Sequence, residues 1–366
     1  MKLRNITILL CAVIAVVIGG AYFVRDRDSD NIGDAGSDTE GSPSASADDP
    51  PRPSKTGSIY TITTPQQTAR KQPVDWNRLA ALSEGNVGTL PKLATADCEH
   101  FLAKNGETPA NLIAIFDQTG DRKWLERALA AFPDSPLVLF NALAESPNAS
   151  AEQRTAWLEK LKAADPENPV AWLISAHAFF KDGHAREGAA EASAALARPG
   201  LYTYFAERIA ATRALYEDSG MHPLDAELIA TFSLKMQLLQ TAQQTGLGLE
   251  AMKNAEGAER AVIAEAARIQ YGLGRMFQTP EASRTLIGQL VGISLETKGL
   301  GSQPTELQET RKAEIESQKA EIRELTKAAN VLLISKDEDQ LTEYLRRFRT
   351  EGELATLRWL KAQSAK

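Results

Sequence analysis

The chain of 366 residues is long enough for one large or two medium domains once terminal tails are removed. Its formal net charge of −7 lacks the basic excess of a nucleic-acid-binding surface, so we expect no nucleic-acid partner. The two cysteines are Cys11 and Cys98, and Cys11 lies in an apolar N-terminal run, which excludes an intramolecular disulfide framework and a cysteine-built zinc site.

The first 24 residues have the pattern of a membrane anchor. Lys2 and Arg4 precede Ile6 to Val24, a run of 19 residues without a charge, and Arg25-Asp26-Arg27-Asp28 follows it. At about 1.5 Å per residue, such a helix nearly spans a hydrocarbon core of about 30 Å. The alternative is a signal peptide cleaved after Gly19-Gly20-Ala21, which would make the protein secreted. We expect a single-pass anchor in the inner (cytoplasmic) membrane, with the remaining chain extracytoplasmic, in the periplasm.

Residues 25–58 have the composition of a disordered linker. They are rich in Asp, Ser, Gly and Pro, and they carry 8 acidic and 4 basic residues, a net charge of −4. Such a segment cannot bury enough apolar surface to fold, and its charge keeps it extended. Ile59 to Thr64 is a short β-branched stretch, and helical patterning begins near Asp75-Trp76. We expect an all-α fold, with a helical repeat domain over 59–300 and a C-terminal helical module over 301–366.

Three helical hairpins are predicted after residue 108, from apolar residues that recur on one face of each segment. Their expected helices are 109–118 with 122–131, 136–145 with 151–164, and 169–181 with 185–197. Ser150 and Gln153 form a capping-box pattern. Two proline pairs recur at 33 residues, Pro133 to Pro166 and Pro136 to Pro169. That period is the length of one helix–turn–helix unit of an α-solenoid.

Residues 136–200 resemble tetratricopeptide repeats. Counted with Pro169 as position 1, four positions carry the residue types that the family prefers there. A large residue is preferred at position 4 (Trp172), a small one at position 8 (Ala176), an aromatic one at position 11 (Phe179) and a small one at position 27 (Ala195). The preceding unit departs from the pattern at Leu143, where a small residue is expected. The resemblance therefore indicates a fold and a mode of binding, and leaves the partner open.

The resemblance implies that the first helix of each unit lines a concave groove. Carried over by position, the groove would present mostly apolar side chains: Leu137, Phe140, Val170, Leu173, His177, Phe180 and Lys181. An exposed apolar concavity marks a protein or peptide partner. The alternative is that another part of the same chain fills the groove, and the last two helices are candidates for that role.

Helices continue after Gly200 without the repeat. The expected ranges are 202–217, 224–245, 249–277 and 280–296, followed by a break at 299–304. Within 280–296, Gly288 and Gly292 would let a neighbouring helix approach closely. Thr305 to Ile334 is predicted to be one long helix with apolar residues at seven-residue intervals. We expect it to pack on its own domain, with self-association as the alternative.

Two helices are predicted to end the chain. Ser335 with Glu338 is expected to cap the first of them, and Gly352 to separate it from the second, which begins at Glu353. The basic residues Arg346, Arg347 and Arg349 are expected to have a structural role near a helix end.

The sequence predicts no catalytic site, no metal site and no cofactor. The four histidines lack zinc-ligand spacing, and the glycine pairs at 246/248 and 272/274 lack the third glycine and the lysine of phosphate-binding loops. Cys98 and His100 are two residues apart on a predicted helix and therefore point in different directions, so we expect a buried structural Cys98.

We therefore expect a bacterial-type, membrane-anchored scaffold that binds a protein or peptide partner outside the cytoplasm, and not an enzyme. One alternative is an all-α cell-envelope enzyme that uses carboxylates such as Glu187 or Glu191. Another is an oligomeric structural protein assembled through Thr305 to Ile334.

Overall fold

The computed structural model describes residues 74–77, 91–146, 148–233, 236–279, 282, 284–335 and 337–364, with the backbone alone at 328–335 and 364. The predicted anchor at 1–24, the linker at 25–58 and the stretch Ile59 to Thr64 lie outside these residues. Every regular element in the described ranges is a helix, so the all-α prediction is confirmed there. None of these described helices is long and apolar enough to span a bilayer.

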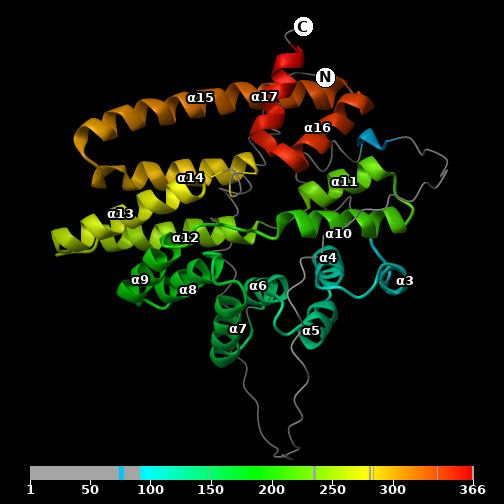
Figure 1. Cartoon of the computed structure of the whole chain (residues 1–366), viewed down its shortest axis with the longest axis horizontal. Coiled ribbons are helices and arrows are strands. Elements are labelled where there is room, and N and C mark those ends of the chain that lie inside the picture. Colours follow the sequence, from blue (N-terminus) through cyan, green and yellow to red (C-terminus); the bar gives the residue numbers. More distant parts are fainter. Residues whose placement is uncertain are drawn as a thin grey trace, which may run out of the picture. The chain divides into compact units, whose positions relative to one another are not determined.

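The first helices pack as consecutive antiparallel pairs (Figure 1). They are α3 (Thr95–Asn105), α4 (Pro109–Thr119), α5 (Arg122–Ala131), α6 (Pro136–Glu145), α7 (Ala151–Ala164), α8 (Val170–Lys181) and α9 (Ala185–Leu196). These bounds match the three predicted hairpins to within one residue. Local signals explain the agreement, because Thr108, Asp121 and Ser150 cap α4, α5 and α7 through their side chains.

The middle of the chain is divided differently from the prediction. It forms α10 (Phe205–Asp218), α11 (Pro223–Phe232), α12 (Gln237–Lys253), α13 (Arg260–Met276) and α14 (Leu286–Gly299), with a 3-10 turn at Leu300–Ser302. The helices predicted at 224–245 and 249–277 are wrong in their bounds. One break follows α11, and the other follows Asn254, where Gly257 has a φ of 71°. The helix predicted from residue 280 begins at Leu286, because the Thr285 hydroxyl caps it by accepting from the Gly288 amide at 3.1 Å.

Helices α12, α13 and α14 lie side by side, and α13 and α14 approach closely (Figure 1). A Cβ atom on Gly292 of α14 would lie 2.9 Å from the carbonyl oxygen of Gly274 in α13. A Cβ on Gly274 would in turn lie 2.2 Å from the backbone nitrogen of Glu296. The close approach predicted for Gly292 is therefore confirmed, and the glycines at this crossing are needed because the two backbones are nearly in contact.

The C-terminal helices are α15 (Thr305–Ser335), α16 (Glu338–Glu351) and α17 (Glu353–Ser364). Ser335 belongs to α15, and Asp337 caps α16 by accepting from the Gln340 amide at 2.9 Å, so the predicted cap at Ser335 is wrong. Asp337 is the better cap because its carboxylate interacts favourably with the helix N-terminus as well as accepting the hydrogen bond.

A second hydrophobic core, here called the C-terminal cluster, joins these helices to α11 and α14. Its buried members are Val74, Leu224, Leu228, Leu286, Ile293, Ile315, Ile322, Leu325, Leu341, Tyr344, Leu345, Leu357 and Leu360. Ile315 and Ile322 belong to the seven-residue pattern of α15. These apolar positions pack against helices of the same chain, while self-association through Thr305 to Ile334 stays a prediction.

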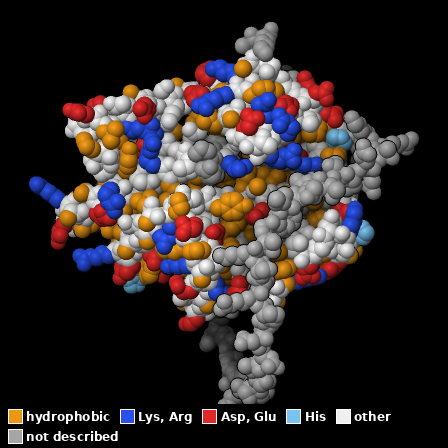
Figure 2. Space-filling model, viewed as in Figure 1, with side chains coloured by type: hydrophobic (Ala, Val, Ile, Leu, Met, Phe, Trp, Pro, Cys, Tyr) orange, Lys and Arg blue, Asp and Glu red, His pale blue; other side chains and the backbone are white. Residues whose placement is uncertain are grey.

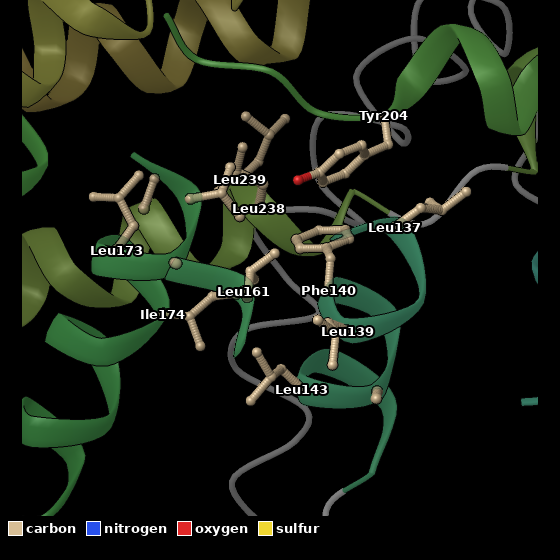
Figure 3. Close-up of a cluster of buried hydrophobic side chains, with 14 of the residues drawn as sticks. Leu137, Leu139, Phe140, Leu143, Leu161, Leu173, Ile174, Tyr204, Leu238 and Leu239 are labelled. Atoms are coloured by element: carbon tan, nitrogen blue, oxygen red, sulfur yellow. The ribbon is translucent and has the colours of Figure 1, made fainter. Parts of the chain in front are cut away.

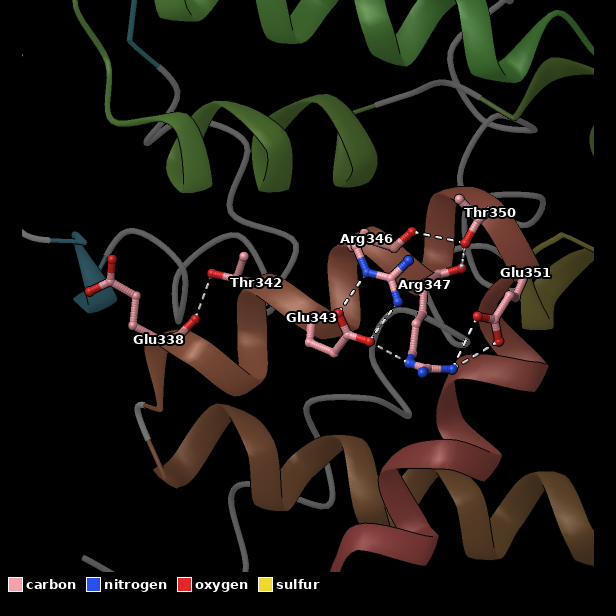
Figure 4. A network of polar contacts seen from close by, with 7 residues as sticks. All are labelled: Glu338, Thr342, Glu343, Arg346, Arg347, Thr350 and Glu351. Atoms are coloured by element: carbon pink, nitrogen blue, oxygen red, sulfur yellow. Dashed lines mark hydrogen bonds and ion pairs between the residues drawn. The ribbon is translucent and has the colours of Figure 1, made fainter. Parts of the chain in front are cut away.

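The basic residues of α16 pair with carboxylates (Figure 4). Arg346 donates to both oxygens of Glu343 at 2.6 Å, and Arg347 lies between Glu343 and Glu351. The third, Arg349, reaches Glu227 of α11 at 2.9 Å. The first two pairs lie on the exposed side of α16, where water screens them, so they contribute little to stability.

Candidate functional site

The predicted groove residues divide into a buried and an accessible set. Four of them are at most 6% exposed, namely Leu137, Phe140, Val170 and Leu173. The accessible set consists of His177 and Phe180, which are partly buried, and Lys181, which is exposed. Figure 3 shows Leu238 and Leu239 of α12 packed over Leu173 and Phe140. A Cβ on Gly248 of α12 would lie 2.3 Å from the ring of Phe180. Helix α12 of this chain therefore covers this face of α6 and α8, whereas α16 and α17 pack elsewhere, against α11 and α15.

The accessible end of α8 includes one histidine, His177, whose neutral form is favoured. Burial lowers the pKa of His177, and the positive charges of Lys181 and Arg154 lower it further, while Asp182 opposes them. His177 is therefore neutral at pH 7, and its imidazole can offer one donor and one acceptor.

Beside Phe140 lies a small pocket of about 50 Å³, here called the aromatic pocket. Its lining residues come from α6, from the segment before α10 and from the starts of α10, α12 and α14: Phe140, Thr203, Phe205, Arg208, Met236, Gln237, Leu238, Leu239, Ala282, Arg284 and Thr285. The volume is enough for a few water molecules or for one small apolar side chain.

The segment that leads into α10 is held in one conformation by buried polar contacts. The Asn168 side chain donates to the Tyr202 carbonyl at 2.9 Å and accepts from the Tyr202 amide at 3.2 Å. The Tyr204 hydroxyl donates to Asp165 at 2.7 Å. Tyr204 has a φ of 54°, a left-handed conformation that costs a non-glycine residue about 1 kcal/mol. These contacts offset that cost and fix where Tyr202 points.

Two aromatic side chains, Phe140 and Phe205, line the aromatic pocket, and each contacts further rings outside it. Tyr202 meets Tyr204 edge-on at 5.1 Å between ring centroids, and Tyr204 lies 5.7 Å from Phe140. On the other side, Phe205 lies 6.2 Å from Phe348 of α16. Tyr202 is 46% exposed. Figure 2 shows hydrophobic side chains gathered near the middle of the face that it draws. A buried aromatic cluster thus ends in one exposed ring.

The floor of the aromatic pocket is a buried ion pair. Arg208 of α10 is 3% exposed and donates to Asp117 of α4 at 2.7 Å and to Gln237 of α12 at 3.2 Å. Gln237 donates in turn to Glu145 at 2.8 Å. At the rim, Arg284 donates to the Arg349 carbonyl at 3.0 Å. The floor connects four helices through charge-assisted hydrogen bonds, which hold the pocket walls in place.

The other residues singled out in the sequence lie apart from this pocket. Cys98 is fully buried, as expected, and burial raises the pKa of its thiol. Glu191 pairs with Lys162 at 3.1 Å, and Glu187 is exposed. Within the described ranges, no cluster of three or more potential metal ligands is present.

Comparison of the chain with protein-family models, with curated proteins and with solved structures found no match. Sequence reasoning missed Tyr202 and Phe205 because it placed them in a helix starting at residue 202. A usable signal was present: three of the five residues from Leu201 to Phe205 are aromatic, in a chain with 6% aromatic residues.

Proposed function

We propose that this chain is a membrane-tethered scaffold of tetratricopeptide-like helical hairpins that binds a protein or peptide partner outside the cytoplasm. The observation that carries the proposal is Tyr202, an aromatic side chain that is 46% exposed although its backbone is fixed at both amide and carbonyl. Tyrosine and arginine are enriched in protein interfaces, and a fixed binding surface loses little conformational entropy on association.

In this proposal the partner inserts one small apolar side chain into the aromatic pocket. Phe140, Phe205 and Leu238 would surround it, and Tyr202 would pack over the adjoining backbone. Arg284 at the rim supplies N–H donors for a carbonyl or carboxylate of the partner. The accessible end of α8, from His177 to Lys181, is the part of the predicted groove that a partner can still reach.

The tether in this proposal is the predicted span Ile6 to Val24, followed by the linker at residues 25–58. A linker of that composition lets the helical domain sample a volume around its anchor, which raises its effective concentration near other envelope proteins. The partner is accordingly expected among proteins exposed outside the cytoplasm.

The test is photo-crosslinking of the full-length chain in cells. A photoreactive phenylalanine analogue replaces Tyr202 in one version and Phe232 in the control, because Phe232 of α11 is also exposed, at 51%. We expect a discrete adduct with an envelope protein from position 202 that is absent from position 232. Adding Arg284→Glu should weaken that adduct, since it reverses the charge at the rim.

Other outcomes would contradict the proposal. Equal adducts from both positions would remove the aromatic pocket as the binding site. Crosslinks only within the chain would remove the partner, and a cytoplasmic protein as the captured species would refute the proposed location. A substitution in the predicted groove, such as Leu173→Asp, would not test this proposal. Leu173 is fully buried, so a charge placed there would report on folding and not on binding.

A further inference from the structure

A second cavity, of about 400 Å³, lies between the end of α13, helix α14 and helix α15. All six lining side chains are polar: Arg275, Gln278, Thr279, Gln289, Arg311 and Gln318. The volume is within the range of small-molecule sites, and it is about the volume that a dozen water molecules occupy in the liquid. Here this space is called the polar cavity.

One wall of the polar cavity is a buried and rigid ion-pair network. Glu296 is fully buried and accepts from Arg311 at 2.7 and 2.9 Å and from Gln278 at 2.6 Å. Arg311 also donates to Gln278 at 3.2 Å and pairs with Glu314. Burial raises the pKa of Glu296, but the hydrogen bonds and charges of its partners outweigh it and lower the pKa overall.

The charges around the polar cavity are balanced. Arg275 and Arg311 are positive, Glu296 and Glu314 are negative, and Arg275 lies 3.6 Å from Glu296. Only the two arginines line the cavity itself, and both are already paired with carboxylates, so their positive charge is compensated. Neither sign of charge is therefore favoured in a ligand.

Two of the lining side chains, Gln289 and Gln318, each hold a buried carbonyl oxygen, Oε1, that has no hydrogen-bond donor among the described residues. Gln289 is only 8% exposed. A buried acceptor without a donor lowers stability, so such groups in folded proteins call for a specific explanation. The Thr279 hydroxyl donates to the Met276 carbonyl and keeps its lone pairs for a further donor.

We propose that the polar cavity binds a small uncharged ligand rich in hydroxyl groups, of the size of a monosaccharide or disaccharide. Each hydroxyl group both donates and accepts, so ligand hydroxyls would donate to Gln289 Oε1 and Gln318 Oε1 once these side-chain amides turn toward the cavity, and would accept from the half-exposed Arg275. An apolar ligand would leave these polar groups unpaired. The site shares no lining residue with the aromatic pocket and stands independently of the proposed partner.

The test is calorimetric titration of the full-length chain, purified in a detergent without a sugar headgroup. Glucose, N-acetylglucosamine and maltose are the neutral probes, and inorganic phosphate and glutamate are the charged controls. We expect saturable binding of at least one sugar with a dissociation constant in the millimolar range or tighter. The charged controls should show at least tenfold weaker binding.

Matched variants locate the site. Gln289→Leu and Gln318→Leu should each weaken sugar binding at least tenfold without lowering the thermal midpoint of the free protein, because each removes an acceptor that has no donor. Gln244→Leu, at an exposed position of α12, should change neither property. If Gln289→Leu fails to fold, Gln318→Leu and the probe panel still decide the outcome.

Three results would overturn the proposal. The first is that none of the three sugars binds saturably, which would mean that water alone fills the cavity. The second is charged controls that bind as tightly as the sugars. The third is unchanged sugar affinity in both glutamine variants.

Discussion

Glu353 joins the start of α17 to the start of α14. Its carboxylate accepts from the Leu286 amide at 2.7 Å, and its own amide donates to the Arg284 carbonyl at 2.7 Å. Burial raises the pKa of this carboxyl group to about 7, although the hydrogen bond from Leu286 acts in the opposite direction. The group therefore changes charge near neutral pH at the joint between two helices.

We expect Glu353 to make stability depend on pH. The pKa of Glu353 is raised on folding from its ordinary value of 4.5 to about 7. The contribution of this group to the free energy of unfolding is therefore fully present below pH 4.5 and is lost as pH rises through about 7. The full shift corresponds to about 3 kcal/mol, and partial exposure reduces the expected loss to about 2 kcal/mol. Urea unfolding at a series of pH values should show this slope, and Glu353→Gln should flatten it.

The control for this prediction is Glu306→Gln, an exposed carboxyl group at the start of α15. It should leave the slope between pH 5 and about 8 unchanged. A slope that survives in Glu353→Gln would show that other groups cause it.

Residue-scale features were predictable where the partners are close in sequence. The capping box of Ser150 and Gln153 is confirmed, because both hydrogen bonds join residues three apart. The contact of Glu353 with Leu286 spans 67 residues, and nothing in either local sequence indicates it. The pairing of Asn168 with Tyr202 was missed for the same reason.

At the scale of elements, the crossing of α13 and α14 depends on Gly274. A Cβ there would lie 2.2 Å from the Glu296 nitrogen and 2.5 Å from its Cα, and backbone atoms cannot move aside cheaply. At Gly272, two residues earlier on α13, a Cβ would meet only the end of the Leu196 side chain, at 2.7 Å. The two glycines therefore differ in what a methyl group would displace.

We expect Gly274→Ala to destabilise the protein by about 2 kcal/mol or more, because overpacking outweighs the gain of about 1 kcal/mol in helix propensity. Gly272→Ala should be neutral or slightly stabilising, since the Leu196 side chain can change rotamer. Thermal and urea unfolding of both variants measure the difference. Equal effects of the two substitutions would contradict the role of close backbone approach.

Element boundaries were predictable where turn residues mark them. The helices at 122–131, 136–145 and 151–164 match the structure because Gly, Pro and Asp lie in the turns that separate them. The break between α11 and α12 was missed, since Leu228, Phe232 and Leu239 continue an apolar face across it. The covering of α6 and α8 by α12 was also beyond the sequence pattern, because periodicity identifies an apolar face and not what packs on it.

At the scale of the whole described unit, the C-terminal cluster is built from segments distant in sequence. The cluster brings together Val74, Leu228 of α11 and Ile293 of α14 with Ile315 of α15 and Leu357 of α17. The apolar stripe of α15 is therefore covered by other helices of the same chain, with α17 on the later side and α14 on the earlier side. Without α16 and α17, this stripe would lose most of its cover and be partly exposed along one face of a long helix.

We expect deletion of residues 337–366 to convert a monomer into an oligomer. Exposed apolar stripes of this length associate with copies of themselves, so a 59–336 fragment should sediment as a dimer or larger species and bind a hydrophobic dye. A 59–366 fragment should sediment as a monomer at tens of micromolar. A 59–361 fragment is the control, because it keeps Leu357 and Leu360.

The same sedimentation experiment separates the scaffold from the oligomeric structural protein considered at the outset. A monomeric 59–366 fragment with an oligomeric 59–336 fragment would mean that α16 and α17 suppress association through α15. An oligomeric 59–366 fragment would mean that another surface associates, since Ile315, Ile322 and Leu325 are already buried within the chain. A monomeric 59–336 fragment without dye binding would contradict the prediction, because it would mean that α11 and α14 cover the stripe without help from α16 and α17.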